Sequence, residues 1–294
     1  KISVLNNYAN QIRDENYDIV IDPYAKLQSR FISLKSGATR KISYDKPFFK
    51  HIYTDVVEKA EIPSKETSCT AIDNRVSLVT PLMDKPIPYA LHPKIYLTEQ
   101  EIQEGKEILE NAGLDLSRKT IMIGILGSGK DKSWPIAYMT QLIGHIQKYY
   151  NFNILFNYIP SQQPVVDEIM NGLDTNDKIY LDVMGKNVRE FLKILNHCQA
   201  FIGNEGGGIN MSKALDVPTF SIYSPHKFPS DWGCFEDGLN HVSVHFQDLD
   251  KYIVDQLTEK QLFNRTTKLY KKLEYSYVRA EADKFLQNNF GTVE

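Results

Sequence analysis

The sequence predicts an α/β protein with two doubly wound, Rossmann-like domains. Short apolar stretches typical of buried strands alternate with amphipathic stretches typical of helices along most of the chain. Two Gly-rich loops each follow one of the expected strands. A Pro-rich stretch interrupts the alternation, so we expect domains at residues 1–92 and 93–256 and a helical tail at residues 257–294.

The first domain contains a β-α-β unit, which implies a parallel sheet. Its helix should end at Gly37, because glycine accepts the left-handed backbone conformation that follows many helices. Five prolines between residues 61 and 97 favour a loop and interdomain linker there. We expect helices at residues 4–15, 27–35 and 48–60 and strands at residues 17–22 and 40–44.

The second domain alternates strictly between strands and helices, which predicts a parallel sheet that binds ligands at the carboxyl ends of its strands. Thr98 and Glu101 form a capping box that opens the first helix. Expected strands lie at residues 120–126, 153–158, 178–182, 200–202 and 219–223, and expected helices at residues 98–112, 135–149, 164–172, 187–197 and 209–215. In the tail, the spacing of apolar residues predicts one buried face, formed by Leu262, Leu269, Leu273, Tyr277 and Phe285.

Composition narrows the class of protein. Lysine and arginine number 34 against 37 aspartate and glutamate, so the formal net charge is −3 and no global positive field favours nucleic acid. Cys69, Cys198 and Cys234 lie far apart and form no CxxC pair, so we expect no disulfide framework and a cytoplasmic setting. We find no apolar stretch long enough to span a bilayer and no signal-peptide pattern, although a chain that opens at Lys1 is compatible with a removed targeting segment.

The first Gly-rich loop, residues 127–135, joins a strand to a helix. Backbone N–H groups and the helix dipole at such a junction attract phosphate, and Lys130 and Lys132 add positive charge beside Ser128. Residues 124–130 match GxxxxGK, but Asp131 follows where a P-loop needs a hydroxyl for magnesium, so we do not expect a P-loop. A solvated basic turn is the simpler alternative.

The second Gly-rich loop also joins a strand to a helix. Gly206, Gly207 and Gly208 let the backbone approach a ligand closely, and Glu205 could accept hydrogen bonds from sugar hydroxyls. Asn210 falls in the first helical turn. A flexible turn is the alternative for this loop alone, but two such loops at strand ends of one domain favour a binding site.

Residues 200–225, AFIGNEGGGINMSKALDVPTFSIYSP, resemble the pattern GNDSGxxHLAAALxxPTxxLYGP of glycosyltransferase family 9. The KSWP at residues 132–135 is similar to that family's KxWP signature, and YDIVID at residues 17–22 is similar to its YDLVIDL stretch. The resemblance covers most of residues 10–230. It implies the GT-B fold of two Rossmann-like domains, with a nucleotide-sugar donor held mainly by the second domain.

The resemblance also implies roles for individual residues. Ser128 and Lys132 would hold the donor pyrophosphate, and Gly206, Gly207 and Gly208 would offer it backbone N–H groups. Gln163 would lie near the ribose. Glu205 stands where the family has Asp facing the sugar, and Asn210 stands where it has His, so the identity of the donor stays open.

Family members open with a strand and a loop that carries the proposed catalytic Asp, and nothing in this sequence corresponds to them. We therefore expect the first domain to be incomplete in this chain and name no catalytic residue. Asp22 follows a strand of the first domain, but the family does not use that position, so we do not promote it.

The function implied is transfer of heptose or a related sugar from a nucleotide sugar, ADP-heptose or a similar one, to a lipopolysaccharide-core or other lipid-linked glycan. No metal and no further cofactor is expected, and peripheral contact with the inner membrane is compatible with the basic residues 268–272. Two alternatives stay open. One is a non-catalytic nucleotide-sugar-binding homologue, and the other is a GT-B-like sugar-nucleotide epimerase, for which no pair of carboxylates or active-site His stands out.

Two further patterns are set aside. Asp248-Leu249-Asp250 matches the DxD metal motif of another glycosyltransferase class, but its place before a helix predicts N-caps. His241 and His245 have a spacing seen among metal ligands, but the sequence around them reads as a strand without further ligands.

Overall fold

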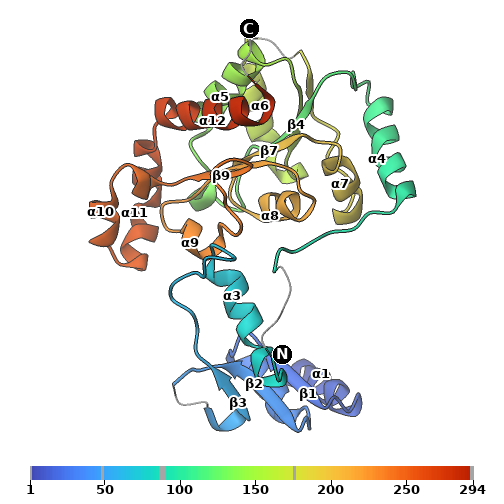
Figure 1. Cartoon of the computed structure of the whole chain (residues 1–294), viewed down its shortest axis with the longest axis vertical. Coiled ribbons are helices and arrows are strands. Elements are labelled where there is room, and N and C mark those ends of the chain that lie inside the picture. Colours follow the sequence, from blue (N-terminus) through green and yellow to red (C-terminus); the bar gives the residue numbers. More distant parts are fainter. Residues whose placement is uncertain (1, 48–49, 86–90, 175–176, 292–294) are drawn as a thin grey trace. The chain divides into compact units, whose positions relative to one another are not determined.

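The computed structural model describes residues 2–47, 50–85, 91–174 and 177–291. The chain divides into two compact units, residues 1–91 with 230–234 and residues 92–229 with 235–294. Each unit contains a parallel sheet flanked by helices (Figure 1). Within the described ranges, no helix is both long and apolar enough to cross a membrane.

The first unit is built on the sheet β1-β2-β3, in which neighbouring strands run parallel. Its strands are β1 (Ile19–Asp22), β2 (Arg40–Tyr44) and β3 (Asp55–Val57), and its helices are α1 (Ile2–Asp14), α2 (Leu27–Lys35) and α3 (Thr70–Ser77). Gly37 has a φ of 75° just after α2, as predicted for the residue that ends this helix. Buried Ile42, Tyr44 and Leu78 form a small core.

Two expectations for the first unit are wrong. Residues 50–60 contain no α-helix: a single 3-10 turn, Lys50–Ile52, precedes strand β3, and residues 48–49 lie outside the described ranges. The β-branched pair Val56-Val57 suits a strand that pairs with β2. The stretch at residues 61–97 is not all linker, since it contains α3, while Pro86 and Pro88 lie outside the described ranges.

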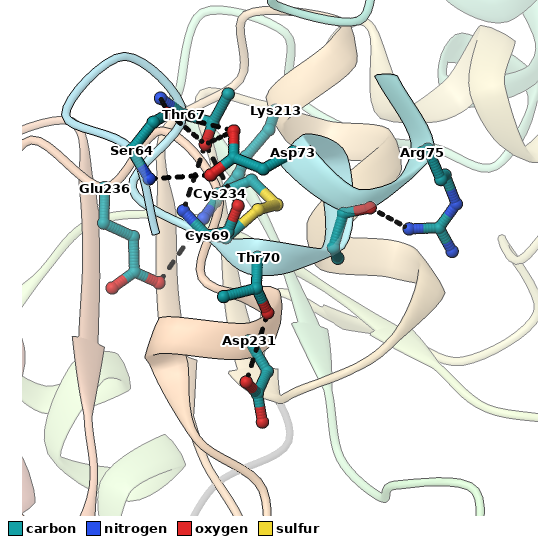
Figure 2. Close-up of a disulfide and its surroundings, with 11 residues drawn as sticks. Ser64, Thr67, Cys69, Thr70, Asp73, Arg75, Lys213, Asp231, Cys234 and Glu236 are labelled. Carbon is teal, nitrogen blue, oxygen red and sulfur yellow. Dashed lines mark hydrogen bonds and ion pairs between the residues drawn. A yellow bond between two sulfur atoms is a disulfide. The ribbon is translucent and has the colours of Figure 1, made fainter. Parts of the chain in front are cut away.

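The expectation that the cysteines form no disulfide is also wrong. Cys69 and Cys234 are joined across 165 positions of sequence, with their Cα atoms 4.8 Å apart (Figure 2). Cys69 is the residue that precedes α3, and Cys234 lies two residues beyond α9 (Pro229–Trp232). Spacing in the sequence could not reveal this pair, because only the fold brings the two residues together. Cys198 is a buried thiol whose pKa burial raises.

The second unit contains a parallel sheet of order β6-β5-β4-β7-β8-β9. The alternation expected from the sequence is therefore confirmed. The strands are β4 (Thr120–Gly124), β5 (Asn153–Asn157), β6 (Ile179–Tyr180), β7 (Ala200–Asn204), β8 (Thr219–Ile222) and β9 (His241–Val244). The helices are α4 (Glu99–Asn111), α5 (Ile136–Tyr149), α6 (Gln163–Asn171), α7 (Val188–Leu195), α8 (Gly207–Ala214), α10 (Lys251–Asp255), α11 (Glu259–Lys272) and α12 (Tyr275–Phe290).

Helices cover both faces of this sheet. Ile121 and Ile123 of β4 pack in a core with residues of α5, α6 and α12, whereas Met122 between them packs with residues of α4, α7 and α8. A strand buried on both faces needs apolar residues at every position, which explains the continuous apolar run in the sequence. The capping box predicted at Thr98 is present, and the apolar face predicted for the tail is buried, with Tyr277 partly exposed.

The patterns set aside in the sequence behave as ordinary structural elements. Asp250 caps α10, where its Oδ1 accepts a hydrogen bond from the Ile253 N–H at 2.9 Å. His241 opens strand β9, and His245 follows it as a fully buried residue. Among the described residues, no group of three or more His, Cys, Asp or Glu side chains is arranged to hold a metal ion.

A glycine sets how closely α4 and α7 pack. A Cβ atom at Gly105 of α4 would lie far inside van der Waals contact with the Lys193 carbonyl of α7. We therefore expect Gly105→Ala to lower the free energy of unfolding by about 1–3 kcal/mol, because the two helices must separate. Gly144→Ala in α5 is the matched control: its nearest neighbour would be a Leu173 methyl at 3.6 Å, so the higher helix propensity of alanine should stabilise the fold by roughly 0.5–1 kcal/mol. Urea denaturation checks both, and equal effects of the two variants would contradict this packing argument.

Candidate functional site

The two Gly-rich loops leave neighbouring strands at the point where the sheet changes direction. From β4 the chain proceeds outward to β5 and β6, whereas from β7 it proceeds to the other side, through β8 and β9. Open α/β sheets bind ligands at such a switch point, outside the carboxyl ends of the strands. The structure therefore brings both predicted loops to the edge where a ligand is expected.

Strands β4 and β7 approach closely where they end. Gly124 pairs with Gly203, whose φ is 155°. A Cβ atom on Gly203 would collide with the backbone of Gly124, so only glycine permits this approach. The close approach places the beginnings of the two loops side by side.

The first loop folds back on itself before α5 begins. Ser133 Oγ accepts a hydrogen bond from the Gly127 N–H at 3.1 Å and donates one to the Gly129 carbonyl at 2.8 Å. Lys130–Lys132 form a 3-10 turn, and α5 starts only after Pro135. The Gly-Lys pair thus does not open the helix, as expected for a chain without a P-loop. Ser128 and Lys130 are exposed.

Asn204 joins the first loop to the second, although no sequence pattern predicted a role for this residue. Its Oδ1 accepts a hydrogen bond from the Trp134 N–H at 2.8 Å, and its Nδ2 donates to the carbonyls of Gly124 and Ile125 at 3.3 and 3.2 Å. The side chain is buried, so these groups have no water to replace a lost partner. The sequence signal that could have identified Asn204 was a polar residue at the end of an apolar strand, directly before Glu205.

Lys132 and Glu205 connect the loops at the surface of the site. Lys132 Nζ lies 3.3 Å from Glu205 Oε1, with 29% of the lysine side chain and 10% of the glutamate side chain exposed. The structure therefore brings together the predicted phosphate-binding lysine and the predicted sugar-facing carboxylate. A site with both charges can interact with an anionic group and a neighbouring hydroxyl group at once.

The three glycines of the second loop differ in their surroundings. A Cβ atom on Gly206 would meet nothing within 4 Å, and one on Gly207 would meet only a Met211 methyl at 3.8 Å. These two positions border open space at the start of α8, where the first N–H groups of a helix have no acceptor within it. A Cβ atom on Gly208 would collide with the Phe201 ring, so this glycine is required by packing. Asn210 is exposed in the first turn of α8.

Gln163 is placed differently from its neighbours in the expected site. Its Nε2 donates a hydrogen bond to Asp167 of the same helix at 2.9 Å. The preceding residue, Gln162, instead donates to the Gly127 carbonyl of the first loop at 3.5 Å. The structure thus brings Gln162 to the loop.

Residues after β8 hold the first loop from another side, and sequence reasoning missed them. Ser224 Oγ donates a hydrogen bond to the Asp131 carbonyl at 2.5 Å, and His226 Nε2 lies 3.5 Å from an Asp131 carboxylate oxygen. Burial, followed by the charge of Lys227, lowers the pKa of His226 below its usual value. The imidazole Nδ1 shares hydrogen bonds with the hydroxyls of Ser224 and Thr266. The sequence signal that could have identified Ser224 and His226 was their position directly after β8, which ends at the same edge of the sheet as β4 and β7.

The C-terminal helices support the site as well. Trp134 is fully buried, and its indole N–H donates to the Leu273 carbonyl at 2.8 Å. Tyr270 of α11 is also buried, and burial and the nearby Glu205 carboxylate raise its pKa well above the usual value. The first loop therefore depends on a residue 139 positions further along the chain.

Comparisons with known proteins agree with this architecture. A family model described as glycosyltransferase family 9 (heptosyltransferase) matches residues 6–260. A glycosyl transferase family 9 structure from Veillonella parvula DSM 2008 has a TM-score of 0.67 at 17% identity, covering 92% of this chain and 79% of that chain. The E. coli ADP-heptose lps heptosyltransferase II has a TM-score of 0.63 at 14% identity, covering 92% and 82% of the two chains. The E. coli heptosyltransferase WaaC, solved with ADP, has a TM-score of 0.60 at 15% identity, covering 91% and 77%. The GT-B fold expected from the sequence is confirmed.

Replacing Asn204 tests the connection between the loops. Asn204→Ala leaves the Trp134 N–H and two strand-end carbonyls without partners, so we expect the free energy of unfolding to fall by about 1–3 kcal/mol. Asn204→Asp can still accept from Trp134 but places a negative charge against two carbonyl oxygens, so it should destabilise at least as much at pH 7. Those oxygens raise the pKa of the new carboxyl in the folded state, so the deficit of Asn204→Asp relative to wild type should shrink as the pH falls towards about 4.

Denaturant unfolding of the three proteins at several pH values checks this. If Asn204→Asp matched the wild type at pH 7, the two amide-to-carbonyl hydrogen bonds would contribute nothing to the junction.

Proposed function

Because the chain belongs to glycosyltransferase family 9, we propose that it transfers heptose or a related sugar from a nucleotide-sugar donor to a lipopolysaccharide-core or other lipid-linked glycan. We propose ADP-heptose or a similar nucleotide sugar as the donor. The observation that carries the proposal is the pair of Gly-rich loops at the switch point, joined by Lys132 and Glu205. A nucleotide sugar has a diphosphate beside a hydroxyl-rich ring, and this site has groups for both.

The diphosphate would lie between the two loops. Backbone N–H groups at Gly206 and Gly207 open α8, whose dipole also favours an anion there. Lys132, with Lys130 and Ser128 on the neighbouring loop, supplies positive charge and a hydroxyl donor. Glu205 would accept hydrogen bonds from the donor sugar, and its pairing with Lys132 keeps both side chains oriented before the donor binds.

The reaction would be a displacement at the anomeric carbon of the donor sugar. The acceptor oxygen forms a bond to this carbon while the bond from carbon to the diphosphate oxygen breaks, and the electron pair leaves with the nucleoside diphosphate. Lys132 and the loop N–H groups would stabilise the charge that develops on the leaving group, an effect that preorganised donors provide without rearrangement. In this proposal that role needs neither a metal ion nor a further cofactor.

The proton of the acceptor hydroxyl must pass to a base, which we do not assign. Asp22 does not serve, because its carboxylate is already engaged in the first unit. One oxygen accepts hydrogen bonds from the N–H groups of Tyr24 and Ala25, and the other accepts from the Tyr53 hydroxyl at 2.6 Å. Asp22 is a structural residue that shapes the turn after β1.

A lipid-linked acceptor places the reaction at a membrane surface, and we propose peripheral contact with that surface. Helix α11 ends in Lys271 and Lys272, both of which are exposed, as is Lys268 one turn earlier. Exposed lysines on one helix favour peripheral contact with anionic lipid headgroups.

Lys132→Ala tests the donor site. Losing a charge-assisted contact to the diphosphate should weaken nucleotide-sugar binding by about 10- to 100-fold. Turnover should fall by a further factor of about 10² because the contact strengthens in the transition state. Lys119→Ala is the matched control, since Lys119 precedes the other end of β4 and stacks on Phe290 at 4.9 Å. Lys119→Ala should leave donor binding and turnover unchanged.

Calorimetric titration with ADP-heptose and with ADP-, GDP- and UDP-hexoses measures donor binding, and a glycan-transfer assay measures turnover. Preference for ADP-heptose, lost in Lys132→Ala, supports heptosyl transfer. Preference for another nucleotide sugar would change the sugar that we propose but would leave the transferase proposal standing. Donor binding without transfer or donor hydrolysis would point to a non-catalytic homologue.

A further inference from the structure

A cavity of about 900 Å³ lies in the second unit, on the face of the sheet that α5, α6 and α12 cover (Figure 1). Its walls are the later turns of α5, the first turns of α12 and the turn that follows α6. Among the described residues that line it, none belongs to either Gly-rich loop. The cavity is therefore not part of the candidate donor site.

The cavity and the first Gly-rich loop lie at different ends of α5. The helix begins at Ile136, directly after that loop, whereas Lys148 of the cavity lies near its other end. At a rise of 1.5 Å per residue, these two positions are about 18 Å apart along the helix axis. A ligand that occupied the cavity would thus bind at a second, distinct site.

Two glycines leave room for the cavity between α5 and the end of α6. A Cβ atom on Gly144 of α5 would already contact a Leu173 methyl at 3.6 Å. A Cβ atom on Gly172 would lie only 2.9 Å from the Thr140 methyl. Side chains larger than alanine at these two positions would fill the space into which a ligand could enter.

Asp283 fixes the wall formed by α5 and α12. One of its oxygens lies 2.7 Å from His145 Nε2 and accepts a hydrogen bond from the Tyr150 hydroxyl at 3.3 Å. The other accepts a hydrogen bond from Arg279 at 3.4 Å. Burial, followed by the charge of Asp283, raises the pKa of Tyr150 to about 12, so this hydroxyl stays protonated and can donate at pH 7. The Asp283 carboxylate is thus occupied by three partners, and it orients the Arg279 side chain beside the cavity.

Two cations reach the cavity from different helices. Lys148 of α5 forms no ion pair with any residue in the described ranges, and its Nζ lies 5.3 Å from the centre of the Tyr149 ring. Arg279 of α12 uses one N–H group on Asp283, and 41% of its side chain is exposed. Since a guanidinium has five N–H donors and an ammonium three, most of the donors of this pair are available to a ligand.

A pair of cations suits a ligand with two negative charges. A phosphate monoester carries a charge of about −1.5 to −2 at pH 7 and has three strong acceptor oxygens, whereas a carboxylate carries a single charge. Asp174 is the one acidic side chain among the described residues that line the cavity, and it belongs to the wall after α6. Its oxygens can accept hydrogen bonds from hydroxyl groups of the same ligand.

Two tyrosine rings complete the lining. Tyr149 of α5 is 48% exposed, and Tyr275 of α12 is partly buried. Burial raises the pKa of Tyr275; the charge of Arg279 opposes this rise, and Asp283 and Tyr149 add to it, so these groups surround one space. The face of an aromatic ring packs well against the C–H groups of a sugar ring or against a nucleobase.

We propose that this cavity binds a small phosphorylated sugar, free or within a nucleotide, at a site separate from the Gly-rich loops. Its phosphate lies between Lys148 and Arg279, its ring packs against Tyr149, and Asp174 accepts hydrogen bonds from its hydroxyls. This site does not depend on the proposed transferase function, because none of these residues belongs to the donor loops.

Calorimetric titration with four probes tests the ligand class. The probes are glucose 6-phosphate, AMP, glucose and inorganic phosphate. We expect glucose 6-phosphate, AMP or both to bind at least about tenfold more tightly than glucose and than phosphate, and the advantage over glucose to shrink as salt is added. The tighter of the two tells a free sugar phosphate from a nucleotide.

Three results of this titration would contradict the proposal. Glucose binding as tightly as glucose 6-phosphate and AMP would overturn the phosphate assignment. Inorganic phosphate binding as tightly as those two would overturn the ring contact with Tyr149. Binding of none of the four probes would overturn the site.

Variants place the bound probe in the cavity. Lys148→Ala and Arg279→Ala should each weaken binding of the tighter probe by about tenfold. Lys284→Ala is the matched control, because Lys284 is an exposed cation of α12 that does not line the cavity, and it should leave binding unchanged. Tyr149→Leu should weaken binding of the tighter probe but leave binding of inorganic phosphate unchanged. Lys148 and Tyr149 are both exposed, so we expect these two variants to fold.

Lys132→Ala separates this site from the donor site. We expect this variant to bind the tighter probe as the wild type does, although it loses affinity for nucleotide sugars. Loss of the probe in Lys132→Ala, with binding retained in Lys148→Ala and Arg279→Ala, would overturn the proposal by placing the probe at the donor loops. Nucleotide sugars that bind to a protein that takes up none of the four probes would refute the cavity and leave the transferase proposal standing.

Discussion

The close approach of β4 and β7 is the constraint on which the candidate donor site depends. Where the chain leaves two neighbouring parallel strands towards opposite sides of the sheet, a crevice forms between the two loops. Both loops can contact one ligand only if the strand backbones are close together. Gly124 and Gly203 permit that distance, and Asn204 then uses its amide to hold Trp134 and two strand-end carbonyls together. Any larger side chain at Gly203 would separate the strands and the loops with them.

Hydrogen bonds within the first loop and to neighbouring segments hold it in place. Ser133 bridges two glycines of the first loop, Ser224 holds the Asp131 carbonyl, and Trp134 anchors the loop to Leu273. The groups that remain available to bind a ligand are the first N–H groups of α8 and the charged ends of Lys132 and Glu205. This division matters for catalysis, since donors held in place by packing stabilise developing charge without first having to reorganise.

The sequence predicted most of the second unit because its signals are local. Strands such as β4 are buried on both faces, so their apolar runs stand out, and Thr98 with Glu101 forms a capping box within four residues. Strand β3 was mistaken for part of a helix because it has three residues and draws its stability from pairing with β2. The Cys69–Cys234 bond and the hydrogen bond by which Leu273 holds the first loop depend on contacts far apart in sequence, which no local pattern encodes. Gln162 ends a 3-10 turn and Gln163 begins α6, so these adjacent side chains have different partners, Gly127 and Asp167.

The connection between β8 and β9 passes from the second unit into the first and back again. It begins with Ser224 and His226, which hold the first Gly-rich loop, and six residues after His226 comes Trp232. Beyond the disulfide, Glu236 pairs with buried Lys213 of α8 at 3.4 Å (Figure 2). Glu236 also accepts a hydrogen bond from Ser243 at 2.5 Å. This segment is fixed at three points: by the Ser224 hydroxyl, by the Cys69–Cys234 disulfide and by the buried Lys213–Glu236 pair. Its fixed points restrict the conformations of the loop, so less ordering remains to be done when ligands bind. That restriction gives a physical reason for a covalent bond between residues 165 positions apart.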